Sequence, residues 1–334
     1  MLNFKTYIEE ALVNKIDNNT KGVMHELLTG YYLNKGKHMP KHIGKTGESA
    51  EDTYNRYSKT IHPTDLKTLH SRAKSAAEDI RKQAEVNGHK VHSVHWTSKP
   101  GDLHKSTGIH ATQKEDPSDI VVSTSHGGSG KNAKHHGVSL KVSDKTAKVP
   151  SSSLGMASAS SNAKDMLAKH KKEITSMHPG LGAPNKAARK AFVKSNPAIH
   201  NKVKEKNRTF LANMAKSHAT ELQNKIKSGK HDEVVKHVRE VLHAHNTPMQ
   251  GSGHNHIKHT TYETAKGAKH ATENPGQDYE HILKDPKNIS VEHSGSQVIF
   301  KHKGKKFASQ AHKFDSQSDP LSSLKSAGRS HLSH

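Results

Sequence analysis

The chain has 334 residues, and its 53 lysine and arginine side chains outnumber 31 acidic side chains to give a formal charge of +22. Leu, Ile, Val and Phe together fall below the roughly 20% that a highly charged chain needs for a large hydrophobic core, so one such core is excluded. Cysteine is absent, which excludes disulfide scaffolds, thiolate zinc sites and cysteine nucleophiles.

The first part of the chain has a helical pattern. Apolar residues at helical spacing predict helix over 6–34, with a break and a new N-cap within 17–20, and polar helix over 50–86 with Pro63 beginning its second part. Residues 21–34 place Gly22, Glu26 and Gly30 in one i, i+4 row. Two glycines beside a glutamate predict that this helix face lies close to another backbone.

Strand patterns follow the helices. Short runs rich in valine and isoleucine predict strands at 90–98, 119–124 and 137–143, and a second group at 289–293 and 297–303. The order of elements predicts an α/β fold, with a small mixed β-sheet flanked by helices.

Between these groups of strands the sequence is helical, basic and then rich in histidine. We therefore expect three regions: a core over 1–149, a large basic helical insertion with a histidine-rich segment over 150–288, and C-terminal strands that complete the sheet, with a polar tail, over 289–334. The basic helical stretch predicts a clamp on a DNA backbone. Its candidate phosphate contacts are Lys186, Arg189, Lys190, Lys202, Lys204, Lys206 and Arg208.

Three polar residues stand out by their positions on predicted elements. Asp119 begins one strand, and Ser139 and Lys141 share a face of the next strand because they are two residues apart. With Glu26 on the preceding helix, these side chains could hold a divalent cation, since Mg²⁺ prefers oxygen ligands and needs only one or two protein carboxylates. Lysine could then orient water or neutralise a phosphate.

The run Pro117-Ser118-Asp119, followed by Ser139-Leu140-Lys141, resembles the PD-(D/E)XK nuclease superfamily, which has the restriction-endonuclease-like fold. Glu26 resembles the glutamate on the first core helix of many members. The resemblance covers residues 21–143, and it implies a metal-dependent phosphodiesterase. It further implies that Asp119 and Glu26 bind Mg²⁺ or Mn²⁺, that Lys141 orients water or the scissile phosphate, and that Ser139 contributes a hydroxyl or backbone contact.

One position departs from the family pattern, which has an acidic residue where this chain has Ser139. Some members with serine there take a carboxylate from a neighbouring helix, and by that analogy Glu26 or Glu173 would replace it. A second Ser-Leu-Lys run, at 323–325, has no strand character around it and is set aside.

A glycine-rich run and a group of histidines are the other candidate sites. The glycine-rich run at 127–132 lacks the first glycine and the final serine or threonine of a P-loop. The histidines His243, His245, His254, His256 and His259 have spacings that can bind transition metals, although 31 histidines in the chain make such clusters common by chance. A histidine–metal nuclease site is the rival enzyme hypothesis.

The sequence thus predicts a metal-dependent DNA endonuclease. Its expected partner is double-stranded DNA, because only 14 residues are aromatic and base stacking on single strands needs more. No membrane partner is expected, a homodimer is compatible, and the expected location is the cytoplasm, or a virion if the protein is phage-encoded. The alternative is a non-catalytic basic protein that binds DNA or forms part of a virion.

Overall fold

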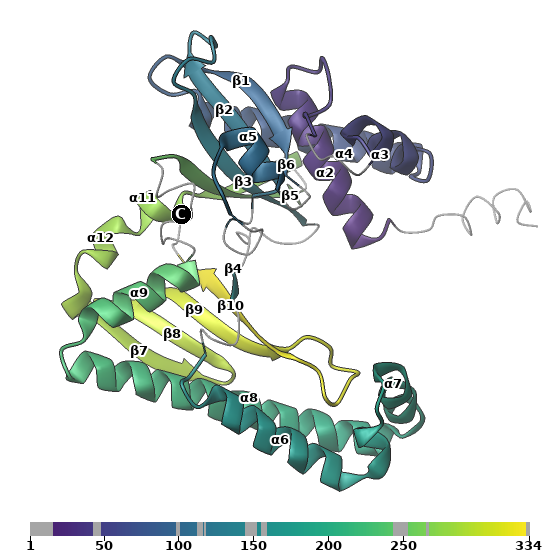
Figure 1. Ribbon diagram of the computed structural model, residues 1–334, viewed down its shortest axis with the longest axis vertical. Coiled ribbons are helices and arrows are strands. Elements are labelled where there is room, and N and C mark those ends of the chain that lie inside the picture. Colours follow the sequence, from purple (N-terminus) through teal and green to yellow (C-terminus); the bar gives the residue numbers. More distant parts are fainter. Residues whose placement is uncertain are drawn as a thin grey trace, which may run out of the picture. The chain divides into compact units, whose positions relative to one another are not determined.

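The computed structural model describes residues 16–42, 48–97, 101–111, 116, 118–143, 152–154, 159–242, 253–264 and 267–331. The chain divides into two compact units (Figure 1). Unit 1 comprises Met1–Pro150 and Asn246–Gly276, and unit 2 comprises Ser151–His245 and Gln277–His334. Each unit is therefore built from two separate stretches of chain.

Unit 1 contains a five-stranded mixed sheet. Neighbouring strands are antiparallel except the third and fourth, which are parallel. In sheet order the strands are β1 (His89–Trp96), β2 (Ile120–His126), β3 (Lys134–Ser143), β5 (Asn255–Thr264) and β6 (Gly267–Glu273). The first three strands and the mixed α/β character agree with the sequence-based prediction.

The last two strands of this sheet come from the histidine-rich segment, where no strand was predicted. β5 buries polar side chains on both faces, including His256 on one face and His259 on the other. The alternation of apolar and polar residues that signals a half-buried strand is therefore missing from its sequence.

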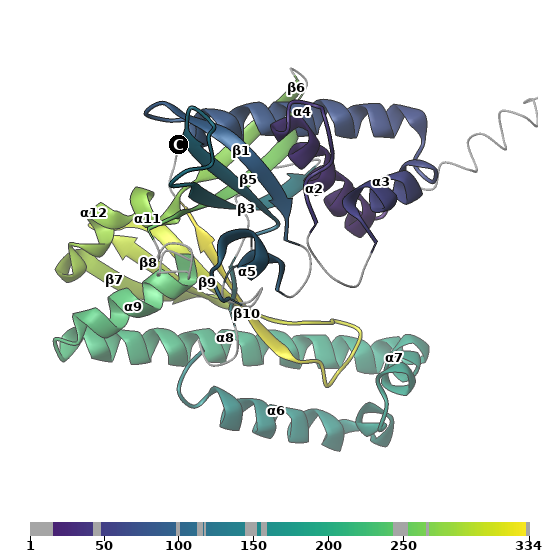
Figure 2. The ribbon, with the colours of Figure 1, turned by 45° about the horizontal axis from the view of Figure 1, so that its top comes forward.

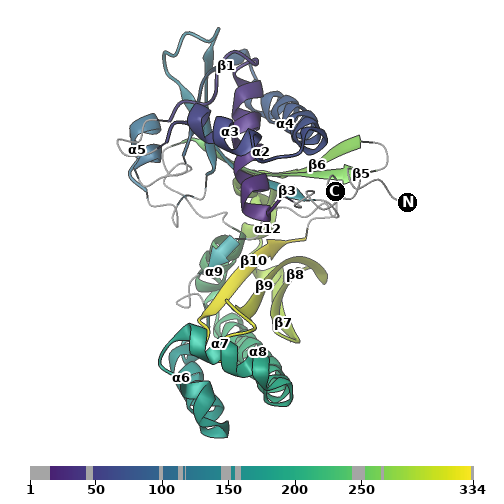
Figure 3. The same ribbon diagram turned by 90° about the vertical axis from the view of Figure 1, so that its right-hand side faces the viewer.

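Two helices lie on this sheet, α2 (Asn18–Leu33) and α4 (Pro63–Ala84), and α3 (Ala50–Ser58) packs against α2. The side chain of Asp17 accepts hydrogen bonds from the amides of Asn19 (2.9 Å) and Thr20 (3.0 Å), which confirms the predicted N-cap. α2 packs against α4 and also contacts β1 and β3, while α4 contacts β5 and β6 (Figure 3).

The core of unit 1 lies between these helices and the sheet. It includes Leu27, Leu33, Ala77, Ile80, Val94, Ile120, Val122, Val138, Leu140 and Ile257. Gly30 of α2 approaches the ring of Pro40 so closely that a Cβ there would lie 2.7 Å from Pro40 Cγ, whereas Gly22 has open space around it. The close contact at Gly30 is therefore with a proline side chain and not with the backbone that the sequence predicted.

Unit 2 contains a second sheet in which all neighbouring strands are antiparallel. Four consecutive strands form it, and a short strand from the start of the unit adds to its edge. In sheet order they are β4 (Ser152–Leu154), β10 (Leu324–Ser330), β9 (Lys305–Phe314), β8 (Gln297–His302) and β7 (Ile289–Ser294).

Four helices accompany this sheet: α6 (Ala163–Met177), α7 (Lys186–Ser195), α8 (Pro197–Lys227) and α9 (His231–Leu242). α8 contacts β7, β8 and β9, and α6 packs against α8 (Figure 2). Shorter helical turns are α5 (Asp102–Thr107) in unit 1, and η2 (Pro179–Gly182), α11 (Pro275–Asp278), α12 (Glu280–Leu283) and η3 (Pro286–Asn288).

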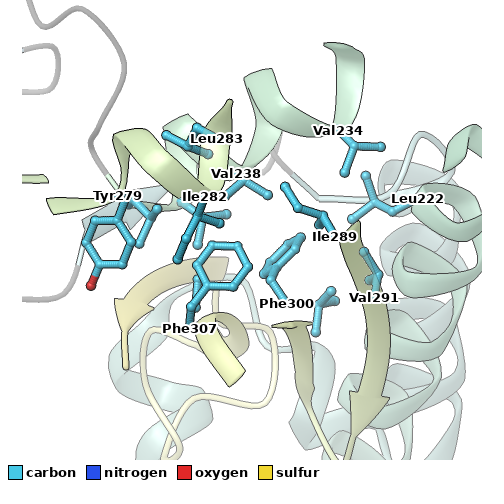
Figure 4. Close-up of a cluster of buried hydrophobic side chains, with 14 of the residues drawn as sticks. Leu222, Val234, Val238, Tyr279, Ile282, Leu283, Ile289, Val291, Phe300 and Phe307 are labelled. Atoms are coloured by element: carbon cyan, nitrogen blue, oxygen red, sulfur yellow. The ribbon is translucent and has the colours of Figure 1, made fainter. Parts of the chain in front are cut away.

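The core of unit 2 contains several aromatic rings. Phe300 and Phe307 from the sheet meet Tyr279 and Ile282 (Figure 4). α8 and α9 supply Leu222, Val234 and Val238 to the same cluster. Aromatic residues are scarce in the chain as a whole, but this core contains Tyr279, Phe300 and Phe307.

Two expectations about the C-terminal region are wrong. The strands at 289–303 were expected to complete the sheet of the first region, but they pair with each other and with β9 in a separate sheet. The residues after Lys305, expected as a polar tail, form β9 and β10. The second Ser-Leu-Lys run does enter a strand, because Leu324 begins β10, so its exclusion cannot rest on lack of strand character.

Candidate active site

Asp119 lies immediately before β2 and is held against β3. Its backbone amide donates to the carbonyl of Val138 (2.9 Å), and its Oδ2 accepts from the amide of Leu140 (2.6 Å). The carboxylate is therefore fixed by the strand that carries Ser139 and Lys141. Pro117 lies outside the described residues.

Glu26 lies on α2 with its side chain partly buried. Its Oε2 accepts a hydrogen bond from the indole Nε1 of Trp96, the last residue of β1, at 2.9 Å. Trp96 is 6% exposed and belongs to the core of unit 1. The helix and the end of β1 are thus joined by a hydrogen bond that aims the glutamate.

The charges of Glu26, Asp119 and Lys141 act on one another. Burial raises the pKa of Glu26 to about 8, with the Asp119 carboxylate adding to the rise, while the Trp96 hydrogen bond and the Lys141 ammonium oppose it. Burial also raises the pKa of Asp119 to about 6, against the hydrogen bond from Leu140 and the charge of Lys141. Glu26 therefore lies within electrostatic reach of Asp119 and Lys141, which lie about a hundred positions later in the sequence.

Ser139 lies in a buried polar row. Its Oγ is 3.4 Å from Nε2 of His256, and the Nδ1 of that imidazole is 3.8 Å from Oδ1 of Asp116. The hydroxyl of Ser118 donates to the same carboxylate oxygen of Asp116. Where the family pattern has an acidic side chain, this chain has a serine hydroxyl facing a histidine.

Close packing of that row depends on Gly137. A Cβ at this position would collide with Oγ of Ser118 and would lie 3.3 Å from Nδ1 of His256. His256 comes from β5, which pairs in parallel with β3 and places His256 opposite Gly137. The sequence gives no signal for Asp116, and it predicts His256 only as a possible transition-metal ligand, not as a neighbour of Ser139, since that proximity depends on a strand pairing between residues far apart in the chain.

A cation at this site would have two carboxylates as its acidic ligands. Across the ranges that the structure describes, no group of three or more histidine, aspartate or glutamate side chains is arranged to hold a metal ion. Glu26 and Asp119 each use one oxygen for a hydrogen bond within the fold. Their raised pKa values indicate carboxylates whose charges lack full compensation, and a hard cation would supply it.

The histidine group predicted as a rival metal site is not assembled in the described residues. His243 and His245 lie outside them. His256 and His259 stand three residues apart on β5 and therefore face opposite sides of the sheet.

Glu173, the other candidate replacement carboxylate, belongs to α6 in unit 2. It forms an ion pair with Lys206 of α8, and the hydrogen bond from that lysine lowers the pKa of Glu173. Its carboxylate is therefore already partnered by a cation from its own unit.

The seven predicted phosphate contacts occupy α7 and the first half of α8. Arg189 forms a two-pronged contact with Asp319, with Nε 2.8 Å from Oδ1 and Nη2 3.2 Å from Oδ2. Arg208 pairs with Glu205 (3.0 Å), and Lys206 with Glu173. The side chains of Lys186, Lys202 and Lys204 are exposed.

A scan against protein-family models, and searches of curated proteins and of solved structures, found no match to this chain. Within the described ranges, the structure contains no helix of the length and apolar character that a membrane span requires.

Proposed function

We propose that this protein is a metal-dependent nuclease that hydrolyses phosphodiester bonds in DNA, with its active site in unit 1. The observation that carries the proposal is the mutual electrostatic effect of Glu26, Asp119 and Lys141 at one end of the sheet. Buried carboxylates with raised pKa values beside a specific cation are typical of functional sites.

In this proposal Asp119 and Glu26 hold a Mg²⁺ or Mn²⁺ ion. Such an ion would stabilise charge that develops on the phosphate and would lower the pKa of bound water. The hydrogen bonds from Leu140 and Trp96 hold the carboxylates in place before a cation arrives. Lys141, which is exposed at the same end of β3, orients water or neutralises the scissile phosphate.

The role of Ser139 follows from its contacts. Its hydroxyl faces His256, and the side chain is buried. We therefore propose that Ser139 supports the backbone of β3, where the amide of the next residue, Leu140, donates to Asp119. We propose that Glu26 takes the role of the acidic residue that the family has in place of Ser139.

Unit 2 supplies the proposed DNA-binding surface. Residues 163–210 contain twelve lysine and arginine residues against three acidic ones. Exposed lysines of this density attract a phosphate backbone without selecting a sequence. Arg189 is excluded from that surface because it binds Asp319 within the fold.

Plasmid cleavage with Mg²⁺ tests the proposal. Asp119→Asn retains a side-chain oxygen that can accept from Leu140 but removes the charge, so we expect cleavage to fall by about a hundredfold or more, as when a preorganised electrostatic group is lost. Lys141→Ala should reduce cleavage similarly, whereas Lys134→Ala, at the other end of β3, should leave it unchanged. Equal cleavage by wild type, Asp119→Asn and Lys141→Ala would remove the site assignment.

The second candidate function is non-catalytic DNA binding or a structural role in a virion. It is favoured by the serine in the acidic position and by the absence of a three-ligand metal cluster among the described residues. Steeply salt-dependent DNA binding without cleavage in Mg²⁺ or Mn²⁺ would support it.

A further inference from the structure

A cavity in unit 1 lies between the end of α2 and α4, on residues that the proposed chemistry does not use. Its volume is about 500 Å³, within the usual range for small-molecule sites. The lining comprises Tyr31, Tyr32, Lys35, Gly36, His70, Lys74, Ala77, Glu78 and Arg81. Three of these side chains are rings and three are cations, in a chain where only 4% of residues are aromatic.

Two of the three rings that line this cavity are held by hydrogen bonds, and the third packs against one of them. His70 on α4 has Nδ1 2.9 Å from the hydroxyl of Tyr32, and Nε2 3.1 Å from the hydroxyl of Tyr54 on α3. Tyr31 meets Tyr32 edge to face, with ring centroids 5.3 Å apart. The ring surface is thus organised before any ligand binds, which reduces the entropy cost of binding.

The cations are arranged so that an anion can approach. The carbonyls at the end of a helix carry partial negative charge. Arg81 donates to those of Tyr32 (3.2 Å) and Leu33 (2.6 Å), which offsets that charge. Lys35 has a left-handed backbone with φ of 59°, which is uncommon for a lysine. Lys35 and Lys74 are exposed beside the rings.

We propose that this cavity binds one unstacked nucleotide, with its base on the Tyr31 ring and its phosphate between Lys35 and Lys74. Aromatic rings bind bases of any kind by stacking, and ammonium groups bind phosphate as point charges. Glu78, an acceptor of hydrogen bonds, selects bases that carry an exocyclic amino group. The inference rests on the proposed function only in taking the nucleotide to be part of the DNA substrate.

The test is titration of the full-length protein, without metal, by a fluorescent aminopurine deoxyribonucleotide whose emission falls on stacking. We expect saturable quenching. Tyr31→Leu should weaken binding by about fivefold or more, which corresponds to loss of one stacking contact. Lys74→Ala should weaken it by about threefold, whereas Lys67→Ala, an exposed lysine on the same helix outside the cavity, should not change it.

Competition separates the parts of the proposal. Deoxyadenylate should displace the probe, and thymidylate, which lacks the amino group, should compete less well. Equal competition by both overturns the role of Glu78. Absence of saturable quenching, equal competition by pyrophosphate, or equal effects of Lys67→Ala and Lys74→Ala overturn the site.

The same preparations are assayed for plasmid cleavage, so that the two proposals can fail separately. Cleavage without nucleotide binding removes the cavity proposal alone. Nucleotide binding without cleavage leaves the cavity site and removes the nuclease activity.

Discussion

The two units bury polar side chains in different ways. Unit 1 holds half-buried carboxylates whose pKa values are raised by burial, and although its His256 and His70 are hydrogen-bonded, its buried His25 has neither ring nitrogen hydrogen-bonded to the described residues. Unit 2 places its buried histidines in a network, in which His312 Nδ1 lies 2.8 Å from Ser326 Oγ and His237 Nε2 lies 2.7 Å from Gln310 Oε1.

This difference in buried polar groups suggests different roles for the two units. A half-buried carboxyl group with a raised pKa costs stability when it ionises, and such groups are common at functional sites. A neutral, hydrogen-bonded histidine network gives directional contacts to a core without a net charge. Unit 1 is therefore the candidate catalytic unit. In unit 2, we expect the buried side chains to contribute to stability and not to chemistry.

The largest expected effect is loss of the aromatic core of unit 2. Phe300 is fully buried, so Phe300→Ala should reduce the free energy of unfolding of that unit by about 3–5 kcal/mol. Hydrogen exchange measured by peptide should report the loss in β7 to β9. Equal loss in peptides of β1 to β3 would contradict the separation of the two cores.

The second largest expected effect is a decrease in the free energy of unfolding of unit 2 at acidic pH. Burial lowers the pKa of His218 to about 2 and of His312 to about 4, with neighbouring histidines adding to both shifts. In the unfolded chain these histidines bind protons near their usual pKa of ~6.5, whereas in the folded unit they stay neutral. The free energy of unfolding of unit 2 is therefore highest above pH ~6.5 and decreases as the pH falls below it.

At pH 4.5 we expect a loss of about 2 kcal/mol for each of these two histidines. His218→Leu should remove its share of the acid sensitivity, and His293→Leu, on an exposed residue, should not. Denaturant melts at pH 7.5 and 4.5 measure both. Acid profiles that coincide for wild type and His218→Leu would refute the role of burial.

Arg189 and Lys202 distinguish structural from DNA-binding cations. Arg189 is 13% exposed and its partner Asp319 is 5% exposed, so Arg189→Ala leaves a buried carboxylate and should cost about 2 kcal/mol of unfolding free energy. Lys202→Ala should leave stability unchanged and should lower the salt dependence of DNA binding by about 0.9 in log–log slope. A reduced slope for Arg189→Ala without a stability change would reverse the assignment.

The remaining expected effect is a stabilisation. Glu26 has a folded pKa above its unfolded value, so its contribution is present below pH ~4.5 and is lost as pH rises through about 8. Glu26→Gln stays neutral and can still accept from Trp96. We expect it to raise the stability of unit 1 by about 1 kcal/mol or more at pH 9 and to change it little at pH 4.5.

The matched control is Glu51→Gln on exposed α3, which should have no such pH dependence. Saturation with Mg²⁺ at ten times the dissociation constant should stabilise wild type by about 1.4 kcal/mol and the Glu26→Gln variant by less. Thermal melts with and without the ion measure this. Equal stabilisation of both proteins would contradict the assignment of Glu26 as a ligand.

Sequence reasoning succeeded where local patterns decide the structure. The strands at 90–98, 119–124 and 137–143 have enough valine and isoleucine to be recognised, and the α2 N-cap has its own chemical signal. It failed for β5 and β6, because residues that β5 buries, such as His259 and Thr261, are polar, so the alternation of apolar and polar residues that marks a strand is missing.

Some features of the candidate site could be predicted from the sequence and others could not. The order of Glu26, Asp119 and Lys141 on successive elements predicts that they meet. No sequence signal predicts that Trp96 donates to Glu26 or that Ser139 faces His256, since both contacts depend on packing between distant segments.

The parallel pairing of β3 with β5 also bears on synthesis at the ribosome. Ser143 ends one strand and Asn255 begins its neighbour, with most of unit 2 encoded between them. Until that later segment leaves the exit tunnel, β3 remains an unprotected edge that could pair with another nascent chain. Slow translation between the two strands should therefore promote aggregation, and a chaperone that covers the growing N-terminal sheet should relieve it.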